Sequence, residues 1–338
     1  MQKTMLAALA ALMLPAAVQA ADSTFAAEAA KDLRERARLP EWTQALPPGA
    51  LDPVLAKRTP TRQSLGGPQG AAPILSVWTS TISAQPGQAV DLFAQLSAVT
   101  PDMNKLTDLL RANREKPTGT ISAQVLDEAG AVLADLRYAD DGKGADARAA
   151  DGVYSARVVL PASRAPALGT AQSLMVQVRA ALADGQVRDA VGGFQYSNPG
   201  ATLTGAFKEA YRQGNLVLQA EANVLAPGRY HLSGTLSDLL GAPLAAAQSA
   251  QTFSTPGKYW MDLPYYGLAL QDRGLTGRLR LSSVTLTSVN AMPNALGPVL
   301  QNAYLTQALN LAVLTRLPFN NPDMLEAARR LEASTITR

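Results

Sequence analysis

The 338-residue chain contains no cysteine and only one histidine, His231. The absence of cysteine excludes a disulfide framework, and with a single histidine the chain has too few ligands for an ordinary zinc site. A lone histidine in an alternating strand is more often a structural residue than a general base. The chain also lacks the Gly-x-Ser-x-Gly elbow of triad hydrolases and the glycine loop that holds nucleotide phosphates. These absences predict a protein that is not an enzyme.

A large excess of positive charge is missing as well. The chain has 30 lysines and arginines against 27 aspartates and glutamates, which gives a net charge of +3 at pH 7. Proteins that bind nucleic acids concentrate lysine and arginine to neutralise phosphates. The sequence therefore predicts no nucleic-acid partner.

The first twenty residues have the pattern of a secretory signal peptide. Lys3 precedes an apolar run from Met5 to Leu14, and the small-residue end Val18-Gln19-Ala20 follows. A cleaved signal has this order of basic, apolar and small residues. A transmembrane helix would need about 20 apolar residues, more than this run contains. We expect removal of residues 1–20, no transmembrane segment in the remaining chain, and a periplasmic or secreted product. A lipid anchor is not expected, since no cysteine can accept one.

Residues 21–72 are predicted to form a helix followed by an arm. The alanine-rich segment Thr24–Leu39 contains good helix formers and the oppositely charged pair Asp32 and Arg36 at i,i+4 spacing. From Pro47 to Pro73, proline, glycine and polar residues dominate. This composition is typical of an extended arm or linker.

Period-two patterns predict a β-sandwich over residues 73–197. Apolar residues alternate at Ile121, Ala123 and Val125, at Tyr154, Ala156, Val158 and Leu160, and at Leu174, Val176 and Val178. Turns rich in aspartate and glycine separate these segments, as in short strands of the immunoglobulin-like class. Helical spacing of apolar residues predicts one helical insertion, over residues 101–116.

A second β-sandwich is predicted over residues 198–318. The turn-forming residues Ser197-Asn198-Pro199-Gly200 mark its boundary. Beyond them, apolar residues alternate at Leu216, Leu218, Ala220 and Ala222, at Tyr230, Leu232, Gly234 and Leu236, and at Leu279, Leu281, Val284 and Leu286. The expected fold is therefore mainly β, with two tandem immunoglobulin-like or jelly-roll-like β-sandwiches.

A short helix is predicted over residues 319–338. Asn321 stands at the N-cap position and Pro322 at the first helical position. The apolar stripe of this helix consists of Leu325, Ala328 and Leu331. We expect this stripe to dock on a β-domain.

An acidic loop at residues 140–154 is the most distinctive stretch of the sequence. Its four aspartates are Asp140, Asp141, Asp146 and Asp151. In one interpretation, aspartate and glycine simply form tight turns. In the other, the carboxylates converge on a calcium ion, which takes about six to eight oxygen ligands and would be the protein's cofactor. The EF-hand spacing is absent, because Lys143 and Ala145 stand where ligands should alternate. The turn interpretation is therefore favoured.

This loop resembles the acidic, glycine-punctuated loop ending in Gly-Asp-Gly-Val-Tyr of exported bacterial β-sandwich proteins, among them the choice-of-anchor X proteins. Here Ala150 replaces the glycine that precedes Asp151-Gly152. A looser resemblance spans Tyr230 to Thr306, with Gly277-Arg278-Leu279 where relatives have Gly-Pro-Tyr. The resemblance implies an exported protein with two sandwiches and implies no reaction, because a shared fold does not transfer function.

Two pairs of adjacent aromatic residues, Tyr259-Trp260 and Tyr265-Tyr266, are candidates for ligand stacking. Neighbouring strand residues face opposite sides, so one member of each pair could be exposed and stack on a sugar. The favoured alternative is that Trp260 and Tyr266 fill the core, since aromatic residues dominate core energetics.

Asp238 and Asp262 are the candidate carboxylates for a glycosidase, which needs two such groups flanking a sugar. The favoured alternative is a turn aspartate and a solvated strand residue.

Three functions remain open at this point. The leading hypothesis is an exported, non-enzymatic binding or structural module of the cell envelope or secretome, whose partner is an envelope protein or glycan. The second is a calcium- or carbohydrate-binding accessory protein that uses the acidic loop or the aromatic strand. The third is an extracytoplasmic hydrolase built on the paired carboxylates Asp238 and Asp262.

Overall fold

The computed structural model describes residues 25–66, 73–97, 119–182, 185–274 and 276–336. The protein is mainly β, with 53% strand and 14% helix arranged as several antiparallel sheets and short helices, which confirms the expectation of a mainly β fold. Among these residues, no helix is both long and apolar enough to cross a membrane. The predicted signal peptide over residues 1–20 and the helical insertion over residues 101–116 lie outside the described residues.

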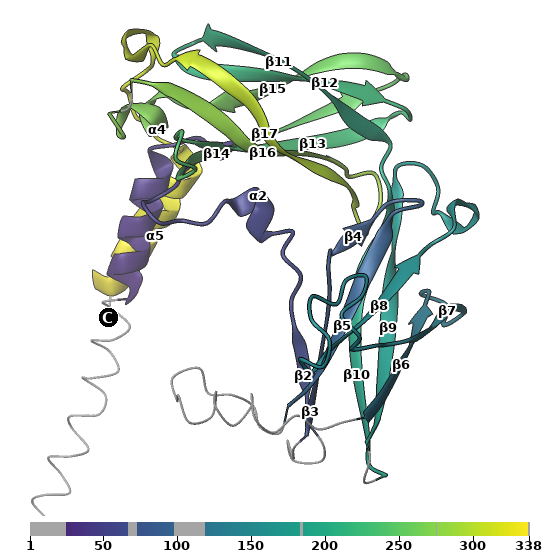
Figure 1. The fold of residues 1–338 in the computed structure, drawn as a ribbon. Helices are drawn as coiled ribbons and strands as arrows, with labels where there is room; N and C mark the ends of the chain where they lie inside the picture. Colours follow the sequence, from purple (N-terminus) through teal and green to yellow (C-terminus); the bar gives the residue numbers. More distant parts are fainter. Residues whose placement is uncertain (1–24, 67–72, 98–118, 183–184, 275, 337–338) are drawn as a thin grey trace, which may run out of the picture.

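The first β-unit (residues 63–198) contains two sheets (Figure 1). One sheet has the order β2 (Gln63–Leu65), β3 (Ile74–Thr79), β5 (Ala89–Ser97) and β8 (Val153–Val159). The other has the order β4 (Ser83–Ala84), β10 (Val187–Asn198), β9 (Thr170–Leu182), β6 (Gly119–Leu126) and β7 (Val132–Arg137). A short 3-10 helix, η2 (Ala162–Arg164), precedes β9. The core draws on both sheets, from Leu75 and Leu92 on one side to Ile121 and Val176 on the other.

The second β-unit (residues 201–308, with β1) is also built from two sheets. The larger has the order β1 (Thr43–Ala45), β14 (Pro243–Phe253), β13 (Gly228–Ser237), β16 (Arg278–Ser288) and β17 (Ala295–Ala308). The smaller has the order β11 (Ala201–Arg212), β12 (Asn215–Val224) and β15 (Gly257–Tyr265). Two short helical turns, α4 (Gly267–Gln271) and η3 (Leu311–Val313), follow β15 and β17. Leu218, Leu232 and Leu281, all at positions expected to alternate, lie in the core of this unit.

The two units are joined where β10 leads into β11, which is where the turn Ser197–Gly200 predicted a boundary. The Tyr230 hydroxyl donates to the backbone oxygens of Gly200, at 3.0 Å, and Ala226, at 2.6 Å. A side chain at Gly200 would place its Cβ only 2.5 Å from the same hydroxyl oxygen, so this position requires glycine. The Ser197 hydroxyl donates to the Leu296 carbonyl of β17 at 3.0 Å. The linkage is therefore packed and hydrogen-bonded.

The segment predicted as an extended arm is folded over part of its length, so that prediction is wrong there. It contains helix α2 (Pro53–Ala56) and strand β2, and its N-cap residue Asp52 holds it to the second β-unit. The Asp52 carboxylate accepts hydrogen bonds from the hydroxyls of Thr235, Ser282 and Ser283, at 2.7 to 3.1 Å. The local composition is that of a loop, but these distant partners determine the conformation.

The C-terminal helix α5 (Pro322–Ile336) lies beside the helix over residues 25–37 (Figure 1). Asn321 caps it as predicted, because its side-chain oxygen accepts from the backbone N–H groups of Asp323 and Met324. Arg34 donates two hydrogen bonds, at 2.9 and 2.6 Å, to Glu332. The sequence predicted docking of this helix on a β-domain, and its hydrogen-bonded partner in the structure is this other helix.

Candidate functional site

The acidic loop is closed by its own backbone. A bridge between Ala139 and Ser155 brings its two ends together. The Asp140 carboxylate accepts hydrogen bonds from the backbone N–H groups of Asp151, at 3.1 Å, and Gly152, at 2.9 Å. Ala150 has a φ of +58°, the left-handed conformation that glycine adopts readily, so the backbone turn is retained although alanine replaces glycine.

Asp146 is the most buried aspartate of this loop, with 5% of its surface exposed. Its two carboxylate oxygens accept from the backbone N–H groups of Gly142, at 2.6 Å, and Arg148, at 3.0 Å. The hydrogen bond from Gly142 is the main reason why the pKa of Asp146 lies below its usual value. The negative charge of Asp146 is therefore already stabilised by the loop itself.

Carboxylate oxygens of Asp140, Asp146 and Asp151 lie within 4.8 Å of one another. Asp141 is not in this group, and its carboxylate accepts from the backbone N–H of Lys143 at 3.0 Å. Asp151 in turn accepts from the N–H of Val153 at 2.8 Å. Every one of these four carboxylates is engaged by loop N–H groups, which is the arrangement that tight turns produce. The geometry supports the turn interpretation of the loop.

The aromatic strand β15 has the opposite orientation to the one favoured from the sequence. Tyr265 is fully buried in the core, and Tyr259 packs against the core with its ring centroid 4.4 Å from that of Phe253. Trp260 faces outward, and the Lys208 ammonium lies 3.7 Å from the centroid of its ring. The expectation that Trp260 fills the core is therefore wrong.

Tyr266 does not fill the core either. It lies just beyond β15, makes an edge contact with Phe319, and donates from its hydroxyl to the Leu317 carbonyl at 3.0 Å. Met261 and Leu263 of β15 are buried and face the core, so the positions that alternate with them, including Trp260, face outward. The Lys208 ammonium covers one face of the Trp260 ring, and Phe319 lies against Tyr266.

The paired carboxylates of the hydrolase hypothesis serve two separate local structures. Asp238 accepts from the backbone N–H groups of Leu240 and Ala242, both at 2.9 Å, in the turn between β13 and β14. Asp262 lies on β15, in the other sheet, and pairs with Arg212 at 2.9 Å. Both residues have the structural roles that were favoured from the sequence. His231 lies on β13, and burial is the main reason why its pKa is lowered.

The side of the β10-β9-β6-β7 sheet that faces away from the core of the first β-unit is a hollowed polar surface, which we call the outward face. Its shallow cavity has a volume of about 740 Å³. Two cross-strand rows line it, Arg137, Ser122, Arg179 and Asp189 in one, and Asp135, Gln124, Gln177 and Val191 in the other. The same alternation that buries one side of each strand necessarily exposes these residues on the other. They were missed from the sequence because the strand pattern was judged from its apolar positions alone.

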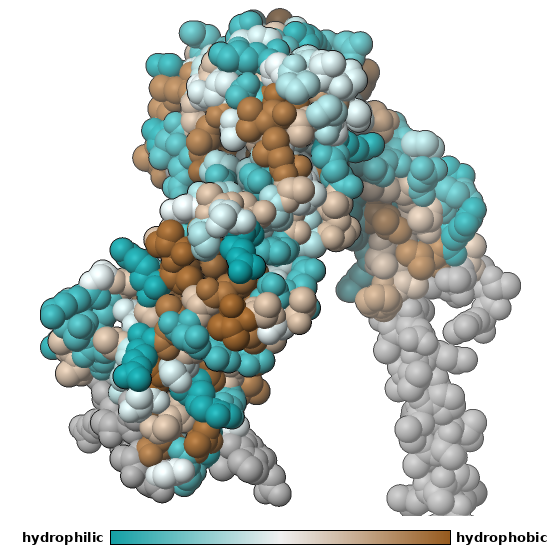
Figure 2. All heavy atoms as spheres, turned by 90° about the vertical axis from the view of Figure 1, so that its right-hand side faces the viewer, coloured by the Kyte–Doolittle hydropathy of each residue, from teal (hydrophilic) through white to brown (hydrophobic). Residues whose placement is uncertain are grey.

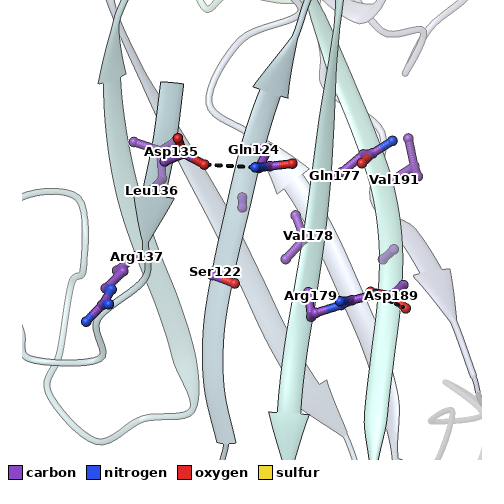
Figure 3. A pocket seen from close by; sticks show the side chains of 12 residues that line it. Ser122, Gln124, Asp135, Leu136, Arg137, Gln177, Val178, Arg179, Asp189 and Val191 are labelled. Atoms are coloured by element: carbon purple, nitrogen blue, oxygen red, sulfur yellow. Dashed lines mark hydrogen bonds and ion pairs between the residues drawn. The ribbon is translucent and has the colours of Figure 1, made fainter. Parts of the chain in front are cut away.

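Polar side chains on the outward face point away from the sheet (Figure 3). Gln124 donates to Asp135 at 2.9 Å, and Arg179 donates to Asp189 at 2.8 Å. The ion pair is largely exposed, with 67% of the Arg179 side chain and 61% of the Asp189 side chain accessible. Exposed pairs contribute little to stability, so these groups can exchange their partners at low cost. The surface can therefore offer amide, guanidinium and carboxylate groups to a ligand.

Many solved structures are distantly similar to the chain, and three of them are described here, whereas no family model and no curated protein matches it. The first is a DUF4785 family protein from Legionella pneumophila, with 17% identity and a TM-score of 0.43 over 71% of this chain and 57% of that protein. The second is a tetra-tandem repeat in the extending region of a large adhesion protein, with 16% identity and a TM-score of 0.25 over 71% and 47%. The third is CopC from Methylosinus trichosporium OB3b, with 16% identity and a TM-score of 0.19 over 35% and 82%. The chain thus spans less than two thirds of the first two proteins.

Proposed function

We propose that the protein is an exported, non-enzymatic binding module of the cell envelope or secretome, and that it binds a partner protein through its outward face. In this proposal the two β-units are tandem sandwiches of the immunoglobulin-like class, as in the exported proteins that the acidic loop resembles. Support for the two sandwiches comes from two separate apolar cores, each with residues from two sheets.

The composition of the outward face carries the proposal. Beside the polar rows, Met175, Val187 and Val191 project from β9 and β10 with 36%, 46% and 47% of their surfaces exposed. Arginine and methionine are enriched at protein interfaces, where amides supply directed hydrogen bonds around apolar contacts. Figure 2 shows the same mixture on a larger scale, since brown apolar residues lie among teal polar ones on the lower unit.

The outward face also lacks the features of a catalytic site. No histidine lines its cavity, and its two aspartates, Asp135 and Asp189, are each bound to a neighbouring side chain. A general acid or base must lie within hydrogen-bonding reach of the proton that it transfers. These surroundings favour binding over catalysis.

A screen of the purified protein against a peptide library and a glycan array tests this proposal. We expect peptide ligands whose binding is lost when Arg179 and Gln177 are both changed to alanine. The matched control is Arg212→Ala with Gln219→Ala, which removes the same two side-chain types from the smaller sheet of the second β-unit.

Three results would overturn the proposal. Binding of glycans alone would favour the carbohydrate-binding alternative. Equal loss of binding in the control variant would place the interface elsewhere. Turnover of either library at enzymatic rates would contradict a non-enzymatic role.

A further inference from the structure

A second cavity, which we call the arm pocket, lies between the arm and the larger sheet of the second β-unit. It has a volume of about 330 Å³. Its floor is the outward side of β13, β14 and β16, with Ser233, Ala246 and Thr287, and the arm supplies Trp42, Pro53, Val54, Lys57 and Arg58. Figure 1 shows α2 beneath this sheet. The volume lies at the lower end of the range for small-molecule sites.

Arg58 brings a positive charge into the arm pocket without a matching negative charge. Among the described residues, the Arg58 guanidinium makes one hydrogen bond, to the Thr285 hydroxyl at 3.1 Å, and no carboxylate pairs with it. Burial lowers the pKa of Arg58, as expected for a cation that has lost water without gaining a counter-ion. Lys57 adds a second cation, and Glu41, which is exposed, is the one acidic residue among those that line the pocket.

The Trp42 ring also lines the arm pocket. Its indole Nε1 is buried and lies out of reach of the cavity, so the ring contributes apolar surface to the wall. Val54, Ala246 and Leu296 add apolar surface to its walls. The pocket thus combines an excess of donors with an apolar lining.

We infer that the arm pocket binds an organic carboxylate, whose two oxygens are held by the Arg58 guanidinium while its apolar body lies against Val54 and Ala246. A planar guanidinium pairs with a carboxylate through two parallel hydrogen bonds, which suits this ligand better than a phosphate held by a single arginine. The carboxylate belongs to a small organic acid or to the C-terminus of a peptide. This site is separate from the outward face, so either proposal can fail alone.

Calorimetric titration of the protein with 4-methylpentanoate tests the inference. We expect a dissociation constant in the millimolar range or tighter. Arg58→Gln should weaken binding by about tenfold or more, because it removes the charge and the hydrogen bonds that hold the carboxylate. Arg62→Gln is the matched control, since it removes the same charge from the same arm outside the pocket and should leave affinity unchanged.

Further probes separate the two sources of the carboxylate. Binding of 4-methylpentanoate without Gly-Gly-Leu indicates a small acid, whereas binding of Gly-Gly-Leu, but not of its C-terminal amide, indicates a peptide terminus. Equal binding of 4-methylpentanamide or of inorganic phosphate would overturn the inference, as would no heat with any carboxylate. If Arg58→Gln lowers the melting temperature, Arg58→Lys is the deciding variant, because it keeps the positive charge but loses the planar fork that pairs with a carboxylate. We expect it to weaken binding, and an affinity equal to that of the wild type would overturn the inference.

Discussion

The two β-units use the polar sides of their larger sheets in different ways. In the first unit, Gln124, Gln177 and Arg179 stay exposed on the outward face. In the second, Thr235 and Ser283 occupy equivalent outward positions on β13 and β16 but are fully buried, because the arm covers them. A segment about 180 residues away in the sequence therefore decides whether a polar sheet surface is available to partners.

The aspartates Asp146 in the first unit and Asp52 in the arm that covers the second differ in the same way. Asp146 in the first unit obtains its hydrogen bonds from loop N–H groups two and four residues away. Asp52 obtains hydroxyl donors from strands β13 and β16 of the second unit, far away in the sequence. The hydrogen bonds of Asp146 stabilise only its own loop, whereas those of Asp52 hold the arm against the second β-unit. We therefore expect the loss of Asp52 to affect more of the molecule.

Removal of the Asp52 carboxylate should have the largest effect on stability. Asp52→Ala leaves the hydroxyls of Thr235 and Ser283 without their acceptor and removes the cap of α2, which together cost about 3 kcal/mol. Denaturant unfolding measures this loss, and limited proteolysis should cut the arm faster. The control Asp127→Ala removes a carboxylate that bonds only to nearby N–H groups and should cost about 1 kcal/mol. Equal losses would contradict the difference between the long-range and the local carboxylate.

Asp146 should make a smaller contribution that depends on pH. Its pKa is lowered in the folded protein, so its contribution is present above the ordinary carboxyl pKa of about 4 and is lost as the pH falls through the lowered value. We expect Asp146→Asn to melt at a lower temperature at pH 7 and to approach the wild type in strongly acidic solution. Asp141→Asn, in the same exposed loop, should change melting less. A constant difference at every pH would contradict the assignment.

Truncation of the outward face should barely change stability. Gln124→Ala combined with Gln177→Ala removes two exposed amides and should shift the free energy of unfolding by less than about 0.5 kcal/mol. Urea unfolding measures this change. A loss of several kcal/mol would mean that the outward face is a structural element, as the covered sheet of the second unit is.

Calcium should have the smallest effect of all. Because the loop carboxylates are bound by backbone N–H groups, about 1 mM calcium should leave the melting temperature equal to that in a chelator. A rise with calcium that disappears in Asp146→Asn would instead establish the calcium-binding alternative and would show that the loop is not satisfied by its own bonds.

Most of the strands could be predicted from alternation, because Leu216, Leu218 and Leu232 lie in the core as their spacing indicated. The outward face could also have been predicted from alternation, since Ser122 and Gln124 lie between the buried residues Ile121, Ala123 and Val125. The orientation of β15 was wrong because it was judged from the size of Trp260 and not from the buried residues around it.

The arm and the arm pocket could not be predicted by the same means. The local sequence around Asp52 is rich in proline and glycine, and nothing in it indicates that Thr235 and Ser283 lie within hydrogen-bonding distance. Arg58 likewise has no distinctive sequence context, and only the fold places it over the larger sheet with Thr285 as its partner and no paired carboxylate. Such sites depend on long-range contacts, which periodicity does not contain.

The helix over residues 25–37 lies beside α5, so two segments from opposite ends of the described chain must meet during folding. Ala30 and Ala37 are 1% exposed in the finished protein, yet their helical partner begins only at Pro322. A ribosome therefore releases the earlier helix long before it makes the later one. Any fragment that stops before Pro322 leaves the earlier helix without this covering, so the first helix of the described chain is completed by the last.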